Sequence, residues 1–172
     1  VNDFSFNSLK WINKLGFNSQ LKSTVKNINY NTKNVTGYNN DKTRSEFHGA
    51  IGYLGEAPMV KRNDKKNLIE YLTPKFLLRY SPNEMRDLNN NVRLTPSNIF
   101  NMDRVNELDV VESGLSASIG VSYEKNEVDD ESNNTRKNLS ISLGQIINEK
   151  EDKDRPTPLD QRFSDLVGEV LW

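Results

Sequence analysis

The chain has 172 residues, of which 34% are hydrophobic, and its 23 basic and 24 acidic side chains give a formal net charge of -1. This length suits one domain of ordinary size, and the balanced charge excludes a basic footprint for nucleic acid or for a polybasic membrane contact. Because the chain has no cysteine and one histidine, His48, thiol catalysis, disulfides and multi-histidine metal sites are excluded.

Alternation of apolar and polar residues, the pattern of a strand with one apolar face, is the main structural signal. The first such segment predicts a strand near 15–30, and its change of phase between Val25 and Ile28 predicts a bulge or the exit of the strand. Weaker patterns predict strands near 45–55 and 68–80. Pro74 counts against the last of these, because proline cannot donate to a sheet ladder.

The next segment, residues 81–110, has no alternation and predicts a long connection. Ser81, Pro82 and Glu84 have the spacing of a helix start, so we expect a short helix near Pro82. Large apolar side chains in the segment argue against a solvated tether, and we expect a partly ordered cover packed over one end of the sheet. The expected loop anchors are Phe100, Met102 and Arg104. The carboxylates within reach of Arg104 are Asp103, Asp109 and Glu112.

The clearest alternation begins at Gly114 and predicts strands near 111–123 and 137–147, followed by a last strand near 162–172. One face of the two clearest strands is apolar and comprises Leu115, Ala117, Ile119, Val121, Leu139, Ile141 and Leu143. The opposite face contains only serine and glycine, namely Ser116, Ser118, Gly120, Ser140, Ser142 and Gly144.

About six strands with long connections indicate an all-β, antiparallel up-and-down meander, because strands that follow each other in sequence usually pair. A soluble sandwich would hide the apolar face in its own core, whereas an outer-membrane barrel would turn it to lipid. The ten-residue alternation matches the ~9–11 residues that cross a bilayer. Six strands are fewer than the roughly eight needed to close a barrel. We therefore expect residues 1–172 to be a segment of a larger barrel, incomplete at both ends.

Carboxylates are numerous, but they lie in polar runs such as 129–131 and 149–154 without an apolar pocket that would tune a pair for acid–base work. The sequence contains no glycine-rich phosphate loop, and His48 has no plausible serine and aspartate partners. We therefore predict no catalytic, metal-binding or cofactor-binding residue and no enzymatic activity.

An ordered set of short motifs runs through the chain. They are Lys26-Asn-Ile-Asn-Tyr, Glu46-Phe-His-Gly-Ala-Ile-Gly-Tyr-Leu, Leu72-Thr-Pro-Lys-Phe-Leu-Leu-Arg-Tyr-Ser-Pro-Asn, Asn98-Ile-Phe-Asn-Met-Asp-Arg-Val, Leu139-Ser-Ile-Ser-Leu-Gly-Gln-Ile-Ile and Ser164-Asp-Leu-Val-Gly-Glu. From about residue 15 to residue 172, this succession resembles the C-terminal barrel domain of the lipopolysaccharide-assembly family LptD, also called organic solvent tolerance protein.

The resemblance implies a large outer-membrane barrel of Gram-negative bacteria, wrapped around the plug lipoprotein LptE. It also implies a periplasmic jellyroll domain that receives lipopolysaccharide from the periplasmic Lpt bridge, and a lateral opening that releases it into the outer leaflet. In this interpretation the apolar face is lipid-facing and the serine and glycine face is lumen-facing. The alternative interpretation is a soluble or surface-exposed β-sandwich binding module, such as an adhesin or a glycan-binding domain.

Overall fold

A single antiparallel sheet dominates the computed structural model, which describes residues 1–33, 35, 43–63, 67–84, 91–128 and 135–172. Its strands are β1 (Asn2–Asn7), β2 (Trp11–Ile12), β3 (Asn18–Tyr30), β4 (Arg44–Glu56), β5 (Met59–Asn63), β6 (Leu68–Ser81), β7 (Gly114–Val128), β8 (Thr135–Asn148) and β9 (Val167–Leu171). In the described part of the chain the one helical turn is η2 (Asn98–Phe100), and none of the described helices is long and apolar enough to cross a membrane.

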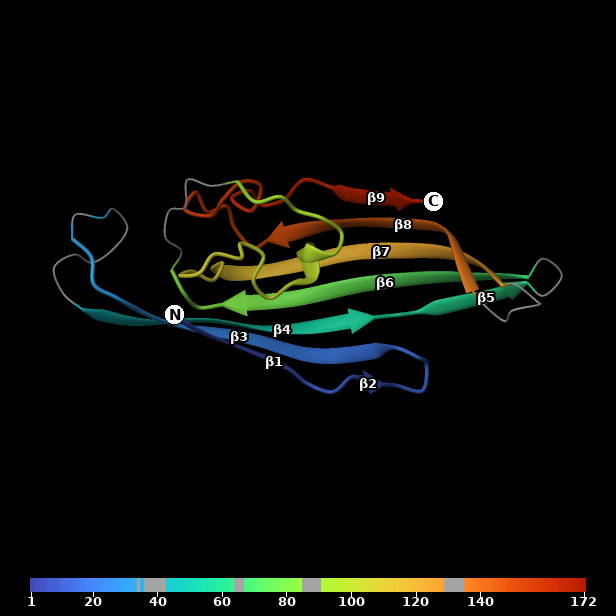
Figure 1. Ribbon diagram of the computed structural model, residues 1–172, viewed down its shortest axis with the longest axis horizontal. Helices are drawn as coiled ribbons and strands as arrows, with labels where there is room; N and C mark the ends of the chain where they lie inside the picture. The colour runs from blue at the N-terminus through green and yellow to red at the C-terminus, as the bar shows by residue number, and fades with distance from the viewer. Residues whose placement is uncertain (34, 36–42, 64–66, 85–90, 129–134) are drawn as a thin grey trace.

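The strands follow each other in the order β1-β3-β4-β6-β7-β8-β9, with β2 paired to β3 and β5 paired to β6 (Figure 1). Every pairing between these strands is antiparallel. The predicted all-β meander is therefore confirmed, and each of the six expected strands is present. In the described residues the sheet is open, with β1 and β2 along one edge and β9 along the other.

The hydrogen-bond ladder on the side of β6 that pairs with β4 and β5 is interrupted at two prolines. The end of β4 pairs with Phe76 and Lys75, β5 pairs with the first half of β6, and the Ala57 N–H donates to the Pro74 carbonyl between these two stretches. The register thus places Pro58 and Pro74 at the interruption, where the ladder does not need their missing N–H groups. Pro74 is therefore compatible with a strand in this position, and β5 continues β4 along the same neighbour.

Two local expectations differ from the structure. The β3–β4 register runs without a break from Asn18 to Tyr30, so the change of phase near Ile28 is not a bulge. Ile28 is instead buried, and it lies on the face opposite to Val25. Residues 82–84 are irregular rather than helical, because the Asn83 side chain donates to the Gly49 carbonyl and to the Ser81 hydroxyl. The rest of the helix expected there, residues 85–90, lies outside the described residues.

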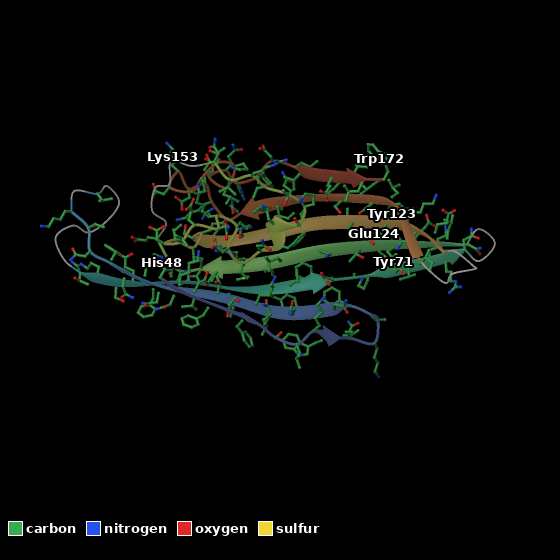
Figure 2. All side chains as sticks on the ribbon, in the orientation of Figure 1. His48, Tyr71, Tyr123, Glu124, Lys153 and Trp172 are labelled. Carbon is green, nitrogen blue, oxygen red and sulfur yellow. The ribbon has the colours of Figure 1, made fainter. Side chains whose placement is uncertain are left out.

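Long and short connections separate to opposite ends of the sheet. The connections 31–43, 82–113 and 149–166 join strands at one end, and 13–17, 64–67 and 129–134 join them at the other. In Figure 2, Lys153 lies near the end with the long connections, and Tyr123 and Glu124 lie toward the opposite end. We call residues 91–113 the covering loop and residues 149–166 the returning loop.

Candidate functional site

The predicted apolar residues lie on one face of the sheet, which we call the outer face. Val121 pairs with Leu143 and Tyr123 with Ile141, so the apolar sets of β7 and β8 are in register. Leu115, Ile119, Val121 and Leu143 are each 37–45% exposed. Ala117, Leu139 and Ile141 are half-buried.

The outer face remains apolar across the sheet. Its exposed side chains on the other strands include Phe4, Phe6, Leu21, Val25, Phe47, Ile51, Leu72, Leu78, Tyr80 and Val170. An exposed apolar surface that extends over all the longer strands far exceeds the scattered hydrophobic residues of ordinary soluble surfaces. Such a surface marks contact with lipid or with another apolar surface.

The opposite, inner face is covered by the two loops. Ser116, Ser118 and Ser140 are buried, and Ser118 donates to the carbonyl of Ile99 in η2 at 2.5 Å. Gly144 is buried as well, whereas Gly120 and Ser142 are half-buried. The serine and glycine side therefore carries the covering loop.

The glycine pair creates the space for the helical turn. Gly120 and Gly144 face each other across β7 and β8. A Cβ at Gly144 would lie 2.2 Å from Cδ1 of Ile99, and one at Gly120 would lie 3.0 Å from Cζ of Phe100. A larger residue at Gly144 would therefore displace η2 from the sheet.

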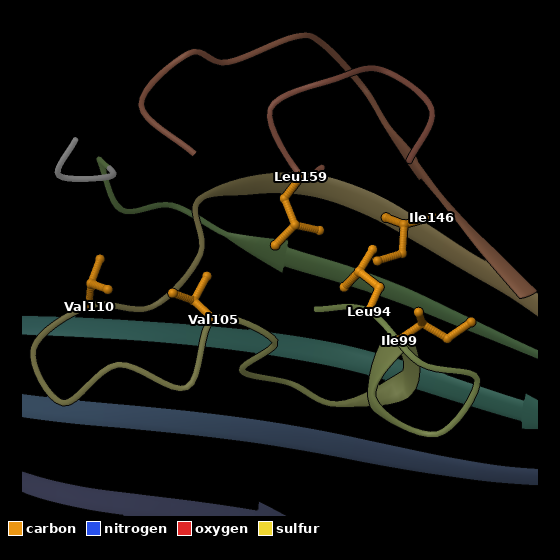
Figure 3. Packing of buried hydrophobic residues seen from close by; sticks show 6 residues of the cluster. All are labelled: Leu94, Ile99, Val105, Val110, Ile146 and Leu159. Atoms are coloured by element: carbon orange, nitrogen blue, oxygen red, sulfur yellow. The ribbon is translucent and has the colours of Figure 1, made fainter. Parts of the chain in front are cut away.

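Two apolar clusters hold the covering loop on the inner face. Figure 3 shows the first, which joins Leu94, Ile99, Val105 and Val110 of the covering loop to Ile146 of β8 and Leu159 of the returning loop. In the second cluster, Met102 and Val111 pack against Ala50, Leu54 and Leu77. Phe100 packs against both clusters.

A buried ionic network lies between the covering loop and β6–β7. Arg104 makes a two-pronged contact with Glu112, with Nε donating to Oε2 at 2.7 Å and Nη2 donating to Oε1 at 2.5 Å. The Arg104 guanidinium also donates to the hydroxyls of Ser116 and Ser118. Arg79, on β6, donates from Nε to the Met102 carbonyl at 2.7 Å and from Nη2 to the Glu112 carbonyl at 2.6 Å. The three charged side chains of this network are at most 3% exposed.

The network has one buried carboxylate between two guanidinium groups. Burial raises the pKa of the Glu112 carboxyl, but the charges of Arg104 and Arg79 outweigh burial and hold this pKa below its ordinary value. Glu112 is therefore ionised at neutral pH. Since a buried charge without its partner is costly, the network holds the loop most strongly when it is complete.

A second buried cation, Lys26, holds residues 103–110 of the covering loop. Lys26 of β3 is 3% exposed, and its ammonium forms an ion pair with Asp103 at 2.5 Å. The same ammonium donates to the carbonyls of Glu107 and Val110. The covering loop is thus attached to β3 as well as to β6 and β7.

The returning loop is attached to β8 through polar side chains. Asn148 donates from Nδ2 to the carbonyls of Leu159 and Gln161, and the Ile146 N–H donates to the Ser164 hydroxyl. The Val92 N–H of the covering loop donates to the Thr157 carbonyl of the returning loop. The last strand begins at Val167 rather than near 162, although the preceding residues already pair with the edge of β8, where the Asn148 N–H donates to the Arg162 carbonyl and the Ser164 N–H donates to the Ile146 carbonyl.

Sequence reasoning identified Phe100, Met102 and Arg104, and the structure brings all three to the inner face. Of the three carboxylates within reach of Arg104, Glu112 is its bidentate partner. Lys26, Arg79 and the returning loop were missed. For Arg79 a signal existed, because it alternates with Leu77 and Ser81 on the face opposite to the exposed Leu78 and Tyr80.

The side chains of this site attach the covering loop to the inner face of the sheet. Among the described residues, no group of three His, Asp or Glu side chains could hold a metal ion. The charged groups donate to carbonyls, hydroxyls and each other, and together they fix a long loop against one face of a sheet whose other face is exposed and apolar.

Comparison with known proteins adds one match. The family model described as LptD, LPS transport system D, matches residues 4–172. No curated protein matches the chain significantly.

Proposed function

Because the chain belongs to the LptD family of lipopolysaccharide transport proteins, which are non-enzymatic and reside in the outer membrane of Gram-negative bacteria, we propose that it forms a section of the barrel wall through which lipopolysaccharide reaches the outer leaflet. In this proposal residues 1–172 belong to the C-terminal barrel domain of a larger protein. The plug lipoprotein LptE and the periplasmic Lpt bridge then act on the complete protein.

The observation that carries this proposal is the contrast between the two faces of one sheet. The outer face exposes apolar side chains from β1 to β9, whereas the inner face carries serine, glycine and charged side chains beside buried apolar ones and is covered in part by the two loops. Large outer-membrane barrels have an apolar outside and a polar inside. We therefore assign Leu115, Ile119, Val121 and Leu143 to the lipid side and Ser116, Ser118 and Ser140 to the lumen side.

The sandwich alternative lacks support from this arrangement. A sandwich needs a second sheet against the apolar face. The described strands form one sheet; loops, not a second sheet, pack on its inner face, and its apolar outer face is exposed. A binding module built on such a sandwich is therefore not favoured by any observation here.

The connections suggest how the section is oriented. Outer-membrane barrels have short periplasmic turns and longer extracellular loops. We propose that the end with connections 31–43, 82–113 and 149–166 is extracellular. The covering loop and the returning loop then fold back into the lumen, where they close this part of the barrel to solutes.

The test is a matched pair of arginine substitutions in the complete protein. Ile119→Arg lies in the middle of the apolar side of β7, and it should destabilise the folded barrel by about 2–4 kcal/mol, the range for a cation at the bilayer midplane. Ser122→Arg, on the inner side of the same strand, should cost far less. Unfolding in denaturant from lipid vesicles measures both, and equal costs for the two variants would contradict the proposal.

A further inference from the structure

A cluster of three lysines surrounds one carboxylate on the inner face, away from the ionic network of the covering loop. Glu56 of β4 forms ion pairs with Lys75 at 3.2 Å and with Lys10 at 3.5 Å. Lys22 of β3 lies within electrostatic range of both Glu56 and Lys10. The cluster therefore has three cations and one anion.

The register places this cluster on the inner side. Glu56 pairs directly with Lys75, two residues along from Leu54 and Leu77, which pack under Met102. Lys22 donates weakly to the Phe100 carbonyl at 3.5 Å, so the cluster lies just beside the edge of the covering loop. The lysine cluster thus belongs to the part of the inner wall that the loop leaves accessible.

The lysine cluster has unused capacity for an anion. The Lys10 and Lys75 side chains are 54% and 35% exposed, whereas that of Glu56 is 14% exposed. Each ammonium has three N–H donors, so their donors outnumber what a single carboxylate can accept. An incoming phosphate would find two cationic charges that Glu56 does not neutralise.

A small polar hollow adjoins Lys75. Its volume is about 210 Å³, and its lining includes Ser97 and Phe100 of the covering loop together with Ser122, Ser142, Glu124 and Glu169 of the sheet. Glu124 stands opposite Tyr71 on the neighbouring strand, toward the end with short connections (Figure 2). Hydroxyls and two carboxylates around an aromatic ring suit the hydroxyl groups of a sugar, and the ammonium of Lys75 beside them suits a phosphate.

From this juxtaposition we propose that the lysine cluster and the adjoining hollow bind a phosphorylated sugar on the lumen side of the wall. The inference rests on the proposed function, in which the transported molecule is a phosphorylated glycolipid. Lys10, Lys22 and Lys75 hold the phosphate, and Ser97, Ser122 and Glu124 receive the sugar. Glu56 keeps the lysines in place when the site is empty and competes with the ligand for them.

The experiment uses the complete protein in detergent, with a photo-crosslinking residue at Ser97. It is incubated with lipopolysaccharide, with the same lipopolysaccharide after removal of its phosphates, or with lipopolysaccharide plus millimolar inorganic phosphate. Loss of charge-assisted hydrogen bonds should reduce the cross-link about tenfold or more. We expect that reduction both for the dephosphorylated probe and for the triple variant K10Q/K22Q/K75Q.

Two variants separate binding from structural support. The matched control K14Q/K61Q/K153Q removes the same charge from exposed positions and should cross-link like the native protein. Glu56→Gln removes the competing carboxylate and should strengthen the cross-link severalfold, an effect that a merely structural role of Glu56 would not produce.

Each remaining outcome overturns the inference. Equal cross-linking of phosphorylated and dephosphorylated probes, or no effect of the lysine triple variant, would show that the phosphate is not bound here. Complete displacement by inorganic phosphate alone would assign the lysines to the free ion rather than to a phosphorylated sugar. Lipopolysaccharide cross-links at other inner positions such as Thr73, but none at Ser97, would overturn this site and leave the proposed function intact. Cross-links at none of the inner positions would overturn both.

Discussion

Replacing Glu112 by glutamine should release the covering loop while leaving the strands in place. Glu112 is fully buried, and its carboxylate is bound by Arg104 through two hydrogen bonds, while Arg79 donates to its backbone carbonyl. Glutamine has nearly the same shape but carries no charge, so two buried guanidinium groups would lose their counter-charge. Breaking one partner of a buried ion pair costs about 3–5 kcal/mol.

Trypsin cleavage after Arg104 measures this release. Arg104 is 3% exposed, so the bond is accessible only when the loop opens. A loss of about 3–5 kcal/mol should raise the cleavage rate of Glu112→Gln by roughly two to three and a half orders of magnitude. Cleavage after the exposed Arg93 should change little, and the exposed Glu151 offers a matched control, Glu151→Gln, that should behave like the native protein.

The double variant R104L/E112L tests whether the cost comes from the pair. Replacing a buried ion pair by apolar residues of similar volume is often nearly neutral, and the double variant leaves only Arg79 without a counter-charge, so it should be more stable than Glu112→Gln, which leaves both arginines without one. If Glu112→Gln left Arg104 protected from trypsin, or if the double variant cost as much as the single one, the account of the network would be refuted.

Three further outcomes follow from the same contacts. Because the pKa of Glu112 lies below its ordinary value of 4.5, the attachment should persist at neutral and mildly acidic pH and weaken as pH falls below about 4.5. Hydrogen exchange of the covering-loop amides against pH should show this loss, and Glu112→Gln should reduce the pH dependence. Lys26→Met should speed hydrogen exchange at residues 103–110 while leaving η2 protected, because the Lys26 ammonium binds Asp103 and the carbonyls of Glu107 and Val110. Uniform acceleration of exchange across the covering loop would contradict the separate role of this contact. Gly144→Ala should destabilise the attachment of the loop by about 1–3 kcal/mol, measured by hydrogen exchange of its amides, because the new Cβ overlaps Ile99. The control Gly168→Ala should have a smaller effect, because its Cβ would meet mainly the flexible end of Leu143.

The strands could be predicted where alternation is long and regular. The pattern from Leu115 to Val121 gave both the strand and its two faces, because a two-residue period is fixed by the pleat. Short or mixed segments failed. β2 has two residues, and β5 has the sequence Met59–Asn63 without alternation, so nothing local distinguishes them from loop.

The site was only partly predictable, because its contacts join distant parts of the chain. Arg104 and Glu112 are eight residues apart, and their pairing could be expected from proximity. Lys26 reaches carbonyls more than eighty residues away, and the enclosure of Ser118 depends on the path of the covering loop across the sheet. Such contacts leave no periodic trace in the sequence.

The most direct test of the membrane account compares the two faces of β7 in a bilayer. A small fluorophore is attached at Ile119 or at Ser122 of the complete protein, which is then folded into vesicles whose lipids carry bromine at mid-chain. The account predicts strong quenching by the brominated lipid at Ile119 and weak quenching at Ser122, where a water-soluble quencher should act instead. Equal quenching at both positions, or stronger lipid quenching at Ser122, would contradict the assignment of the apolar face to lipid.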